Sequence, residues 1–449
     1  MSRLVGNQVA FELIGLWVLE FALSFWLAYA LLGAGVGYSA GFQRPAFNHA
    51  VILALTAVLT TSAIGLYRAE AFRRTRSMLA NTALGGLVAF PVAWGVGWLL
   101  GLDAGRLLGP DALWPLKIVG TWIAALFSIR LLFLAAVRSG LFVRRVAVLG
   151  PVSSVAGTAA AVRTAHRGFI EIADLRGTEG TVPDLAVLHR AGIRNLLASP
   201  EALAALNPRV RAAYAGRGII VESEMGFWER CLKRVNVAHL DDGWVAEVDT
   251  IRIGRLQSAV NRAGDIGISL ALLIFTLPLM LLVALLVRLD SPGPVLYRQE
   301  RVGLGGRPFT LLKFRSMRAD AEARGPVWAK QRDARVTRIG SFMRRTRIDE
   351  LPQLLNVLRG EMGFIGPRPE RPHFVEKLAE VIPYYRERAR VKPGLTGWAQ
   401  VNFPYGASIE DARGKLSYDL YYVKHRSLLL DLAILFATVR VILFQEGSR

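Results

Sequence analysis

Two adjacent acids, Asp349 and Glu350, form the pattern in this sequence that points most directly to chemistry. Leucines follow them at helical spacing, starting with Leu351 and Leu354, so the pattern predicts that the pair begins a helix. Pro352 fits a first helical turn. One interpretation is structural, because acids at a helix N-terminus stabilise it by about 0.5–2 kcal/mol. The other, which is compatible with the first, is a carboxylate nucleophile beside a carboxylate that binds Mg²⁺ and substrate phosphates.

Basic residues dominate the part of the chain that holds these acids. The net charge of the whole chain is +20, and +14 of it lies within residues 251–449. Nearby arginines would lower the pKa of a carboxylate and keep it ionised. A basic excess is typical of nucleic-acid binding, but also of cytoplasmic membrane faces and phosphate-rich substrates. The single cysteine, Cys231, excludes an internal disulfide framework and a CxxC metal cluster, and the six histidines lack zinc-ligand spacing.

The N-terminal third has the composition of membrane-spanning helices. Four apolar stretches are each about the ~20 residues needed to cross a bilayer: Phe11–Leu32, Ala50–Tyr67, Met78–Leu102 and Leu113–Val137. They predict a four-helix transmembrane domain over residues 1–139, with a buried soluble bundle as the alternative. Glu12 and Glu20 lie in the first stretch, where we expect them near an end or facing the bundle.

The charges between these stretches predict their orientation. Arginines concentrate after the second and fourth stretches, at Arg68, Arg73, Arg74 and Arg76 and then at Arg138, Arg144 and Arg145. Positively charged loops stay in the cytoplasm. Both ends of the bundle, and the chain that follows it, are therefore predicted to be cytoplasmic.

Residues 140–250 have the pattern of a separate α/β domain. Val143–Gly150, Arg194–Ala198 and Gly218–Val221 are predicted strands, and Val155–His166 is a predicted helix. This alternation predicts a parallel sheet. The turn at residues 150–154 lacks the second glycine of a dinucleotide fingerprint. We therefore expect a degenerate Rossmann-like domain with a structural or regulatory role.

The next apolar stretch, Ile266–Val287, is long enough to span a bilayer, but arginines flank both of its ends. Both ends are thus predicted to be cytoplasmic. Pro278 near its middle removes a backbone donor, and Thr276 is placed to satisfy the freed group. These features predict a re-entrant helix–break–helix that enters and leaves by the same face. A plain kinked transmembrane helix is the alternative.

A series of ordered motifs follows. Two short strands, Val295–Gln299 and Phe309–Phe314, are predicted around a glycine-rich turn at 303–306. The motifs are KFRSM at 313–317, RIDELPQLLNV at 347–357, PRP at 367–369, PGLTGWAQV at 393–401 and YDLYYVKHRSLLLDL at 418–432. With the proline-interrupted apolar segment before them, they resemble the bacterial sugar transferase family, the monotopic polyprenyl-phosphate phosphoglycosyl transferases. The four N-terminal helices resemble the long subgroup of that family, which starts exopolysaccharide or O-antigen repeat units.

The resemblance implies a reaction. Such enzymes pass a sugar-1-phosphate from a UDP-sugar to undecaprenyl phosphate and release UMP. By resemblance, Asp349 is the nucleophile that forms a covalent phosphosugar intermediate, and Glu350, beside Asp349, binds Mg²⁺. Arg368 matches the family's phosphate-binding arginine, and Lys313 and Arg315 match the basic pair of KFRSM, which we also expect near phosphate. Asp419 is a candidate for Mg²⁺ or substrate binding, or for a structural hydrogen bond.

The resulting expectation is a membrane protein of α and α/β type. It comprises a transmembrane bundle (1–139), a degenerate Rossmann-like domain (140–250), and a re-entrant helix with a mixed α/β catalytic domain (251–449). We expect it in the bacterial inner membrane as a homodimer, with the catalytic domain in the cytoplasm and no nucleic-acid partner. One departure from the family is Leu277, where a small polar residue often precedes the proline. The alternative functions are an inactive scaffold of polysaccharide assembly and a nucleotide-sugar-modifying enzyme acting through residues 140–250.

Overall fold

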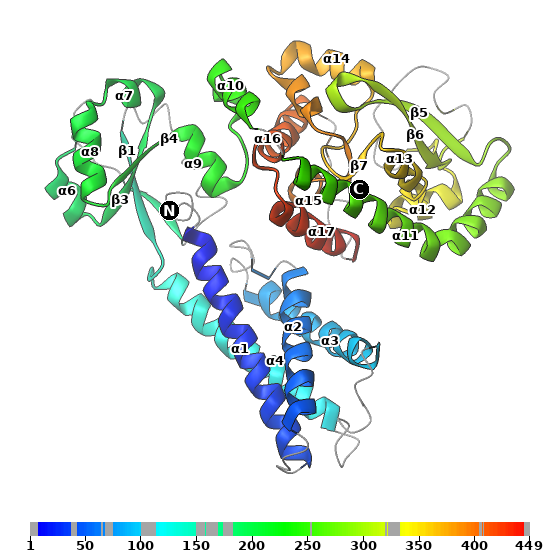
Figure 1. Ribbon diagram of the computed structural model, residues 1–449, viewed down its shortest axis with the longest axis horizontal. Coiled ribbons are helices and arrows are strands. Elements are labelled where there is room, and N and C mark those ends of the chain that lie inside the picture. Colours follow the sequence, from blue (N-terminus) through cyan, green and yellow to red (C-terminus); the bar gives the residue numbers. More distant parts are fainter. Residues whose placement is uncertain are drawn as a thin grey trace. The chain divides into compact units, whose positions relative to one another are not determined.

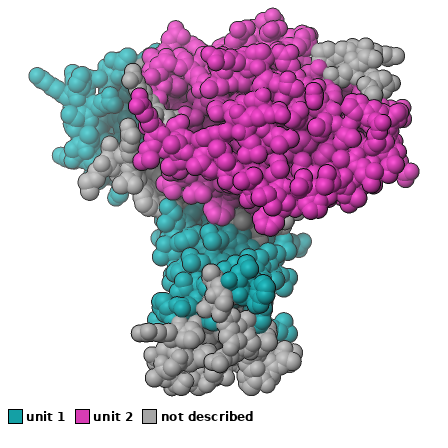
Figure 2. Space-filling view, turned by 45° about the vertical axis from the view of Figure 1, so that its right-hand side comes forward, with its two compact units in different colours: residues 1–232 teal, residues 233–449 magenta. Residues whose placement is uncertain are grey.

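The computed structural model describes residues 8–36, 43–63, 66–67, 75–99, 114–149, 158, 169–173, 183–251, 254–318, 321, 333–403, 406 and 408–443. The chain forms two compact units, residues 1–232 and 233–449 (Figure 2). The boundary falls inside the predicted α/β domain, and the division into three domains stays a prediction.

The first unit begins with four long helices that contact one another in a bundle (Figure 1). They are α1 (Gln8–Val36), α2 (Gln43–Ala63), α3 (Thr75–Leu99) and α4 (Trp114–Arg138). They coincide with the four predicted apolar stretches. Helices α1, α3 and α4 are long and apolar enough to cross a membrane, whereas the apolar part of α2, Phe47–Ser62, is shorter.

Polar side chains inside the bundle pair with one another. The carboxylate of Glu20 is completely buried and accepts a hydrogen bond from Arg130 Nη2 at 2.8 Å. The hydroxyl of Tyr67 donates to the same carboxylate, and Glu12 forms an ion pair with Arg144. The expectation that both acids face the bundle or lie near its end is confirmed, because an ion pair removes much of the cost of a charge in an apolar surrounding.

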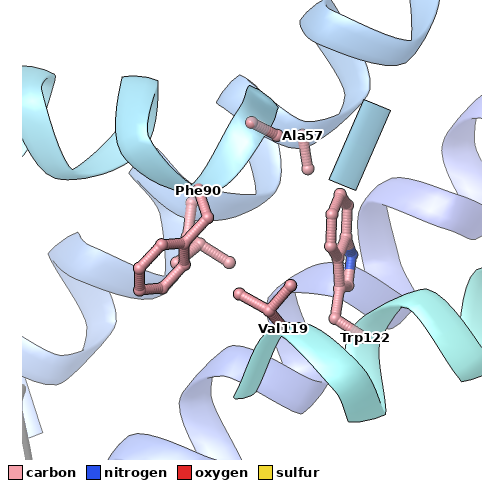
Figure 3. Close-up of a pocket in the computed structure, with 6 residues that line it drawn as sticks. Ala57, Phe90, Val119 and Trp122 are labelled. Atoms are coloured by element: carbon pink, nitrogen blue, oxygen red, sulfur yellow. The ribbon is translucent and has the colours of Figure 1, made fainter. Parts of the chain in front are cut away.

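The bundle encloses a small apolar pocket between α2, α3 and α4. Figure 3 shows Ala57, Phe90, Val119 and Trp122 directed into it, and Leu53 and Ala89 complete the lining. The lining offers no ionisable group, so the pocket has no evident catalytic chemistry.

The first unit ends with a parallel sheet whose strand order is β2-β1-β3-β4. The strands are β1 (Arg144–Leu149), β2 (Ile170–Ala173), β3 (Ile193–Ala198) and β4 (Ile220–Ser223). Short helices connect them: α6 (Leu185–Arg190), α7 (Pro200–Ala205) and α8 (Pro208–Gly216), with α9 (Glu224–Phe227) and the π-helix η4 (Trp228–Leu232) at the end. The three predicted strands and their parallel pairing are confirmed. The predicted helix 155–166 and the turn 150–154 lie outside the described residues, apart from Thr158.

The second unit starts with the 3₁₀ turn η5 (Val237–His239), α10 (Asp242–Thr250) and the long apolar helix α11 (Arg255–Asp290). Helix α11 does not end at Pro278, and Figure 1 shows its ribbon changing direction along its length. A proline inside a helix removes one donor and bends the axis, and helical structure continues on both sides. The expected rescue by Thr276 is wrong in detail. Pro278 frees the carbonyl of Ile274, whereas the Thr276 hydroxyl donates to Leu272.

Two small sheets and a set of helices follow. Strands β5 (Leu296–Val302) and β6 (Pro308–Phe314) form an antiparallel hairpin around η6 (Leu304–Gly306), as predicted. Strands β7 (Gly363–Ile365) and β8 (Gly394–Thr396) form a parallel pair. The remaining elements are α12 (Arg338–Thr346), η7 (Ile348–Glu350), α13 (Gln353–Arg359), α14 (Pro372–Val381), η8 (Tyr385–Arg390), α15 (Trp398–Asn402), α16 (Ile409–His425) and α17 (Leu428–Leu443).

The outer surface of α11 is apolar along most of its length. Phe275 is 83% exposed, and Leu256, Leu281 and Leu289 are also exposed. Only part of one side of α11 packs against the rest of the second unit. There, Val283 and Val287 join a core cluster with Phe314 and Met343. A large exposed apolar surface on one helix is typical of a segment embedded in lipid.

Candidate active site

The acid pair lies on the 3₁₀ turn η7, between α12 and α13. Asp349 and Glu350 are both buried. The predicted helix does follow, but α13 begins only at Gln353, and neither η7 nor α13 has a side-chain cap. The acids therefore do not cap α13, although both lie in the first turn of η7.

Glu350 is instead held by basic residues from two other elements. Its Oε1 accepts a hydrogen bond from Lys313 Nζ at 2.9 Å and another from Arg368 Nη2 at 2.7 Å. Lys313 comes from β6, and Arg368 comes from the Pro-Arg-Pro loop after β7. Arg347 Nη1 lies 3.9 Å from Glu350 Oε2. The fold thus gathers residues separated by up to 55 positions in the sequence around one carboxylate.

A buried asparagine fixes β6 against the helix that follows the acids. The side-chain amide of Asn356, on α13, donates to the Thr310 carbonyl at 2.7 Å, and its Oδ1 accepts from the Leu312 backbone N–H at 3.0 Å. Both contacts lie within three residues of Lys313. Asn356 therefore sets the distance between the strand that carries Lys313 and the turn that carries Glu350.

The two acids have opposite electrostatic surroundings. Burial alone would raise the pKa of Glu350, but Arg368, Lys313 and Arg347 outweigh it and hold that pKa well below its usual range. Burial raises the pKa of Asp349, Lys313 opposes this, and the charge of Glu350 adds to it. The expected lowering of carboxylate pKa by nearby basic residues thus holds for Glu350 and not for Asp349. Burial also lowers the pKa of Lys313, against the pull of Glu350.

Arg315 does not join this group. Strand β6 ends at Phe314, and the buried guanidinium of Arg315 turns toward the end of α11. Its Nη2 donates to the carbonyls of Ser291 at 2.6 Å and Val287 at 3.3 Å, and to Ser291 Oγ at 3.0 Å. These carbonyls lack helical partners because α11 ends there. The structure thus assigns Arg315 a contact with the membrane helix, and its predicted place near phosphate stays a prediction.

Asp419 pairs with a different basic residue. It is buried on α16 and forms an ion pair with Arg388 Nη2 at 2.7 Å. Arg388 is therefore a defined partner for the structural role that was one alternative for Asp419. Pro278 lies within α11, as described above.

Sequence inspection missed three residues of the site: Arg344, Arg347 and Asn356. The charge of Arg344 opposes the burial that raises the pKa of Asp349. Arg347 has a left-handed backbone, with φ 57°, at the junction of α12 and η7. Their nearness to the acids in the chain was a usable signal. Asn356 lies in the motif RIDELPQLLNV, but the motif does not indicate its contacts with Thr310 and Leu312, which are more than 40 positions away.

Comparison with known proteins defines the class. Residues 256–445 match the bacterial sugar transferase family, and this range includes the site and α11. A Rhizobium leguminosarum protein named exopolysaccharide production protein PSS is 43% identical over 193 residues, which cover 41% of this chain and 95% of that protein. The chain belongs to the bacterial sugar transferase family.

Two further relatives have more specific names. An Aeromonas hydrophila UDP-N-acetylgalactosamine-undecaprenyl-phosphate N-acetylgalactosaminephosphotransferase is 41% identical over 242 residues, or 50% of this chain and 57% of the relative. An Escherichia coli UDP-glucose:undecaprenyl-phosphate glucose-1-phosphate transferase is 42% identical over 182 residues, or 40% of this chain and 39% of the relative. The matches thus span less than two thirds of these two relatives.

Proposed function

We propose that this protein transfers a sugar-1-phosphate from a UDP-sugar to undecaprenyl phosphate, releasing UMP, as the first membrane step of exopolysaccharide or O-antigen repeat-unit synthesis. The observation that carries the proposal is the site itself. A buried carboxylate, Asp349, is adjacent to a second one, Glu350, that Lys313 and Arg368 hold in place. The names of the relatives support undecaprenyl phosphate as the acceptor.

The reaction has two displacements. A carboxylate oxygen of Asp349 forms a bond to the phosphorus that carries the sugar, and the bond from that phosphorus to UMP breaks, so UMP leaves with the electron pair. An oxygen of the lipid phosphate then attacks the same phosphorus, and the bond to Asp349 breaks. Asp349 is recovered as a carboxylate. Burial favours this role, because a weakly solvated carboxylate is a stronger nucleophile.

The residues of the site fit the Mg²⁺ that the family resemblance implies. Mg²⁺ commonly takes one or two carboxylates, with substrate phosphates and water as its other ligands. Both short contacts of Glu350 are to Oε1, and Oε2 lies 3.9 Å from Arg347 Nη1, so Oε2 and the adjacent carboxylate of Asp349 would be the groups that hold such an ion. Among the described residues no larger cluster of acids, histidines and cysteines gathers. When bound, Mg²⁺ would neutralise phosphate charge, while Lys313 and Arg368 orient Glu350.

Release of UMP tests the function. Purified protein in detergent or nanodiscs, with undecaprenyl phosphate present, is expected to release UMP from at least one member of a panel of UDP-sugars. No release from any of them would favour the inactive scaffold. A changed nucleotide sugar without UMP release would favour an enzyme acting through residues 140–250.

We further propose that α11 is re-entrant, so that the catalytic unit stays on the cytoplasmic side of the inner membrane. Arginines flank α11 at both ends, and a proline lies inside it. The bend of its ribbon is consistent with both ends on one face of the bilayer (Figure 1).

A tag at the C-terminus is therefore expected to be inaccessible to membrane-impermeant reagents in intact spheroplasts. Pro278→Ala removes the bend and is expected to shift part of the population to an accessible tag, because a straight α11 is long enough to span. Pro91→Ala is the matched control, since Pro91 lies inside α3 and is not expected to change tag accessibility. Labelling of the wild-type tag from outside would refute the re-entrant arrangement.

A further inference from the structure

The Pro-Arg-Pro loop that carries Arg368 is held through its carbonyl groups. Four successive carbonyls accept hydrogen bonds from four donors outside the loop. The pairs are Gly394 N to Pro367 O at 2.9 Å, Arg388 Nη2 to Arg368 O at 2.9 Å, Arg301 Nη1 to Pro369 O at 3.1 Å, and Val302 N to Glu370 O at 2.9 Å. Prolines have no N–H, so this loop has few donors of its own and its conformation depends on these neighbours.

Among these four donors, Arg388 contacts Arg368, the residue whose side chain reaches Glu350. It comes from η8 and is largely buried. Its Nη2 contacts both the carbonyl of Arg368 and the carboxylate of Asp419, at 2.9 and 2.7 Å. Its Nη1 donates to the hydroxyl of Tyr385 at 2.8 Å, and its guanidinium carbon lies 5.3 Å from that ring. One guanidinium group thus joins α16, η8 and the loop.

Asp419, on α16, is the acidic partner of Arg388. Its side chain is 1% exposed, and Arg388 is its ion-pair partner. Burial raises the pKa of Asp419 to about 6, with Arg388 opposing and Glu370 adding to the shift. A carboxylate this deeply buried is kept in place by its charged partner. Its placement favours a contact with Arg388 over a contact with substrate.

We propose that Arg388 and Asp419 are positioning residues, which hold the Pro-Arg-Pro loop so that the side chain of Arg368 reaches Glu350. The inference rests on the proposed function, because Arg368 and Glu350 are the groups it places. The chain of contacts runs from Asp419 to Arg388, to the Arg368 carbonyl, and from the Arg368 side chain to Glu350 Oε1. In this role Asp419 never touches the substrate.

Arg388→Lys tests the proposal, because lysine keeps the charge but cannot hold three partners in the planar geometry of a guanidinium. We expect kcat for UMP release to fall about 10- to 100-fold, since small displacements near reacting groups have effects of this size. The KM for the UDP-sugar is expected to change less than about threefold. Arg390→Lys is the matched control: Arg390 lies on the same 3₁₀ helix but pairs with Asp249 and Glu387, so kcat should be unchanged.

A double-mutant cycle shows whether Arg388 acts through Arg368. The combined Arg388→Lys, Arg368→Lys variant should lose at least about threefold less activity than the product of the two single losses. Losses that simply multiply, or wild-type kcat in Arg388→Lys, would overturn the proposal. If Arg388→Lys does not yield folded protein by thermal unfolding and gel filtration, Asp419→Asn replaces it in the same cycle.

Different results would contradict the positioning role of Asp419 and the transferase function. A substrate-binding Asp419 would appear as a raised KM in Asp419→Asn with kcat little changed, which contradicts positioning and leaves the transferase function intact. Wild-type protein that releases no UMP contradicts the proposed function itself.

Discussion

Asp349→Asn is expected to abolish release of UMP from a UDP-sugar, with kcat reduced by more than about 1,000-fold. An amide has nearly the shape of the carboxylate but is not a competent nucleophile, so no bond to the sugar-bearing phosphorus forms. Incubation with UDP-sugar labelled in the sugar should leave label attached to the wild-type protein and none attached to the variant. Full turnover by purified Asp349→Asn would rule out the covalent mechanism.

The same variant should remain folded. Burial raises the pKa of Asp349, so the fold disfavours its charge, and a neutral side chain at this place is not expected to lower the thermal unfolding temperature. Glu376→Gln is a suitable control, because Glu376 is an exposed acid on α14 in the same unit. It should retain wild-type activity and stability. Loss of activity in both variants would indicate a general effect of removing charge.

Glu350→Gln is expected to abolish UMP release as well, but through a different physical effect. It removes the negative charge on which Lys313 and Arg368 converge, and leaves two cations close together with only a neutral amide between them. We expect kcat to fall by more than about 100-fold. We also expect the free energy of unfolding to fall by about 1–3 kcal/mol, because two partly buried cations are left without their counter-charge.

The pH dependence of unfolding distinguishes this loss of stability in Glu350→Gln from a loss of catalytic function alone. The folded-state pKa of Glu350 lies well below its usual range. Its stabilisation is therefore complete above the unfolded-state pKa, about 4.3, and is lost as the pH falls through the folded-state value. Glu350→Gln should lack this part of the acid destabilisation in thermal unfolding. If the stability of Glu350→Gln follows that of the wild type at every pH, the ion pairs of Glu350 with Lys313 and Arg368 do not stabilise the fold.

Much of the secondary structure follows from local pattern. The four N-terminal helices, the hairpin of β5 and β6, and the strands β1, β3 and β4 lie close to their predicted ranges, because apolar periodicity and turn residues act over short distances. Strand β2 was not predicted. The acid pair was predicted to begin a helix. It lies instead on a 3₁₀ turn, and Leu351 and Pro352 separate it from the first residue of α13.

The sequence predicted the contacts of single side chains less well than it predicted the secondary structure. Lys313 and Arg315 are two residues apart in one motif, and the sequence treats them alike. The structure separates them because β6 ends at Phe314 and the chain turns, so Lys313 reaches Glu350 while Arg315 reaches the end of α11. The length of a strand to within one residue depends on its partners in the sheet, which local pattern does not specify.

By itself, the sequence determined the membrane helices, the motif order that identifies the family, and the adjacent acids with a basic surrounding. Only the tertiary structure decided which basic residues meet Glu350, that Arg388 contacts the Pro-Arg-Pro loop, and that Asp419 pairs with Arg388. The reason is physical. Composition and periodicity act over a few residues, whereas Lys313, Glu350 and Arg368 meet only after β6, η7 and the loop have packed together. Such contacts depend on long-range closure and on the desolvation that burial imposes on each charge.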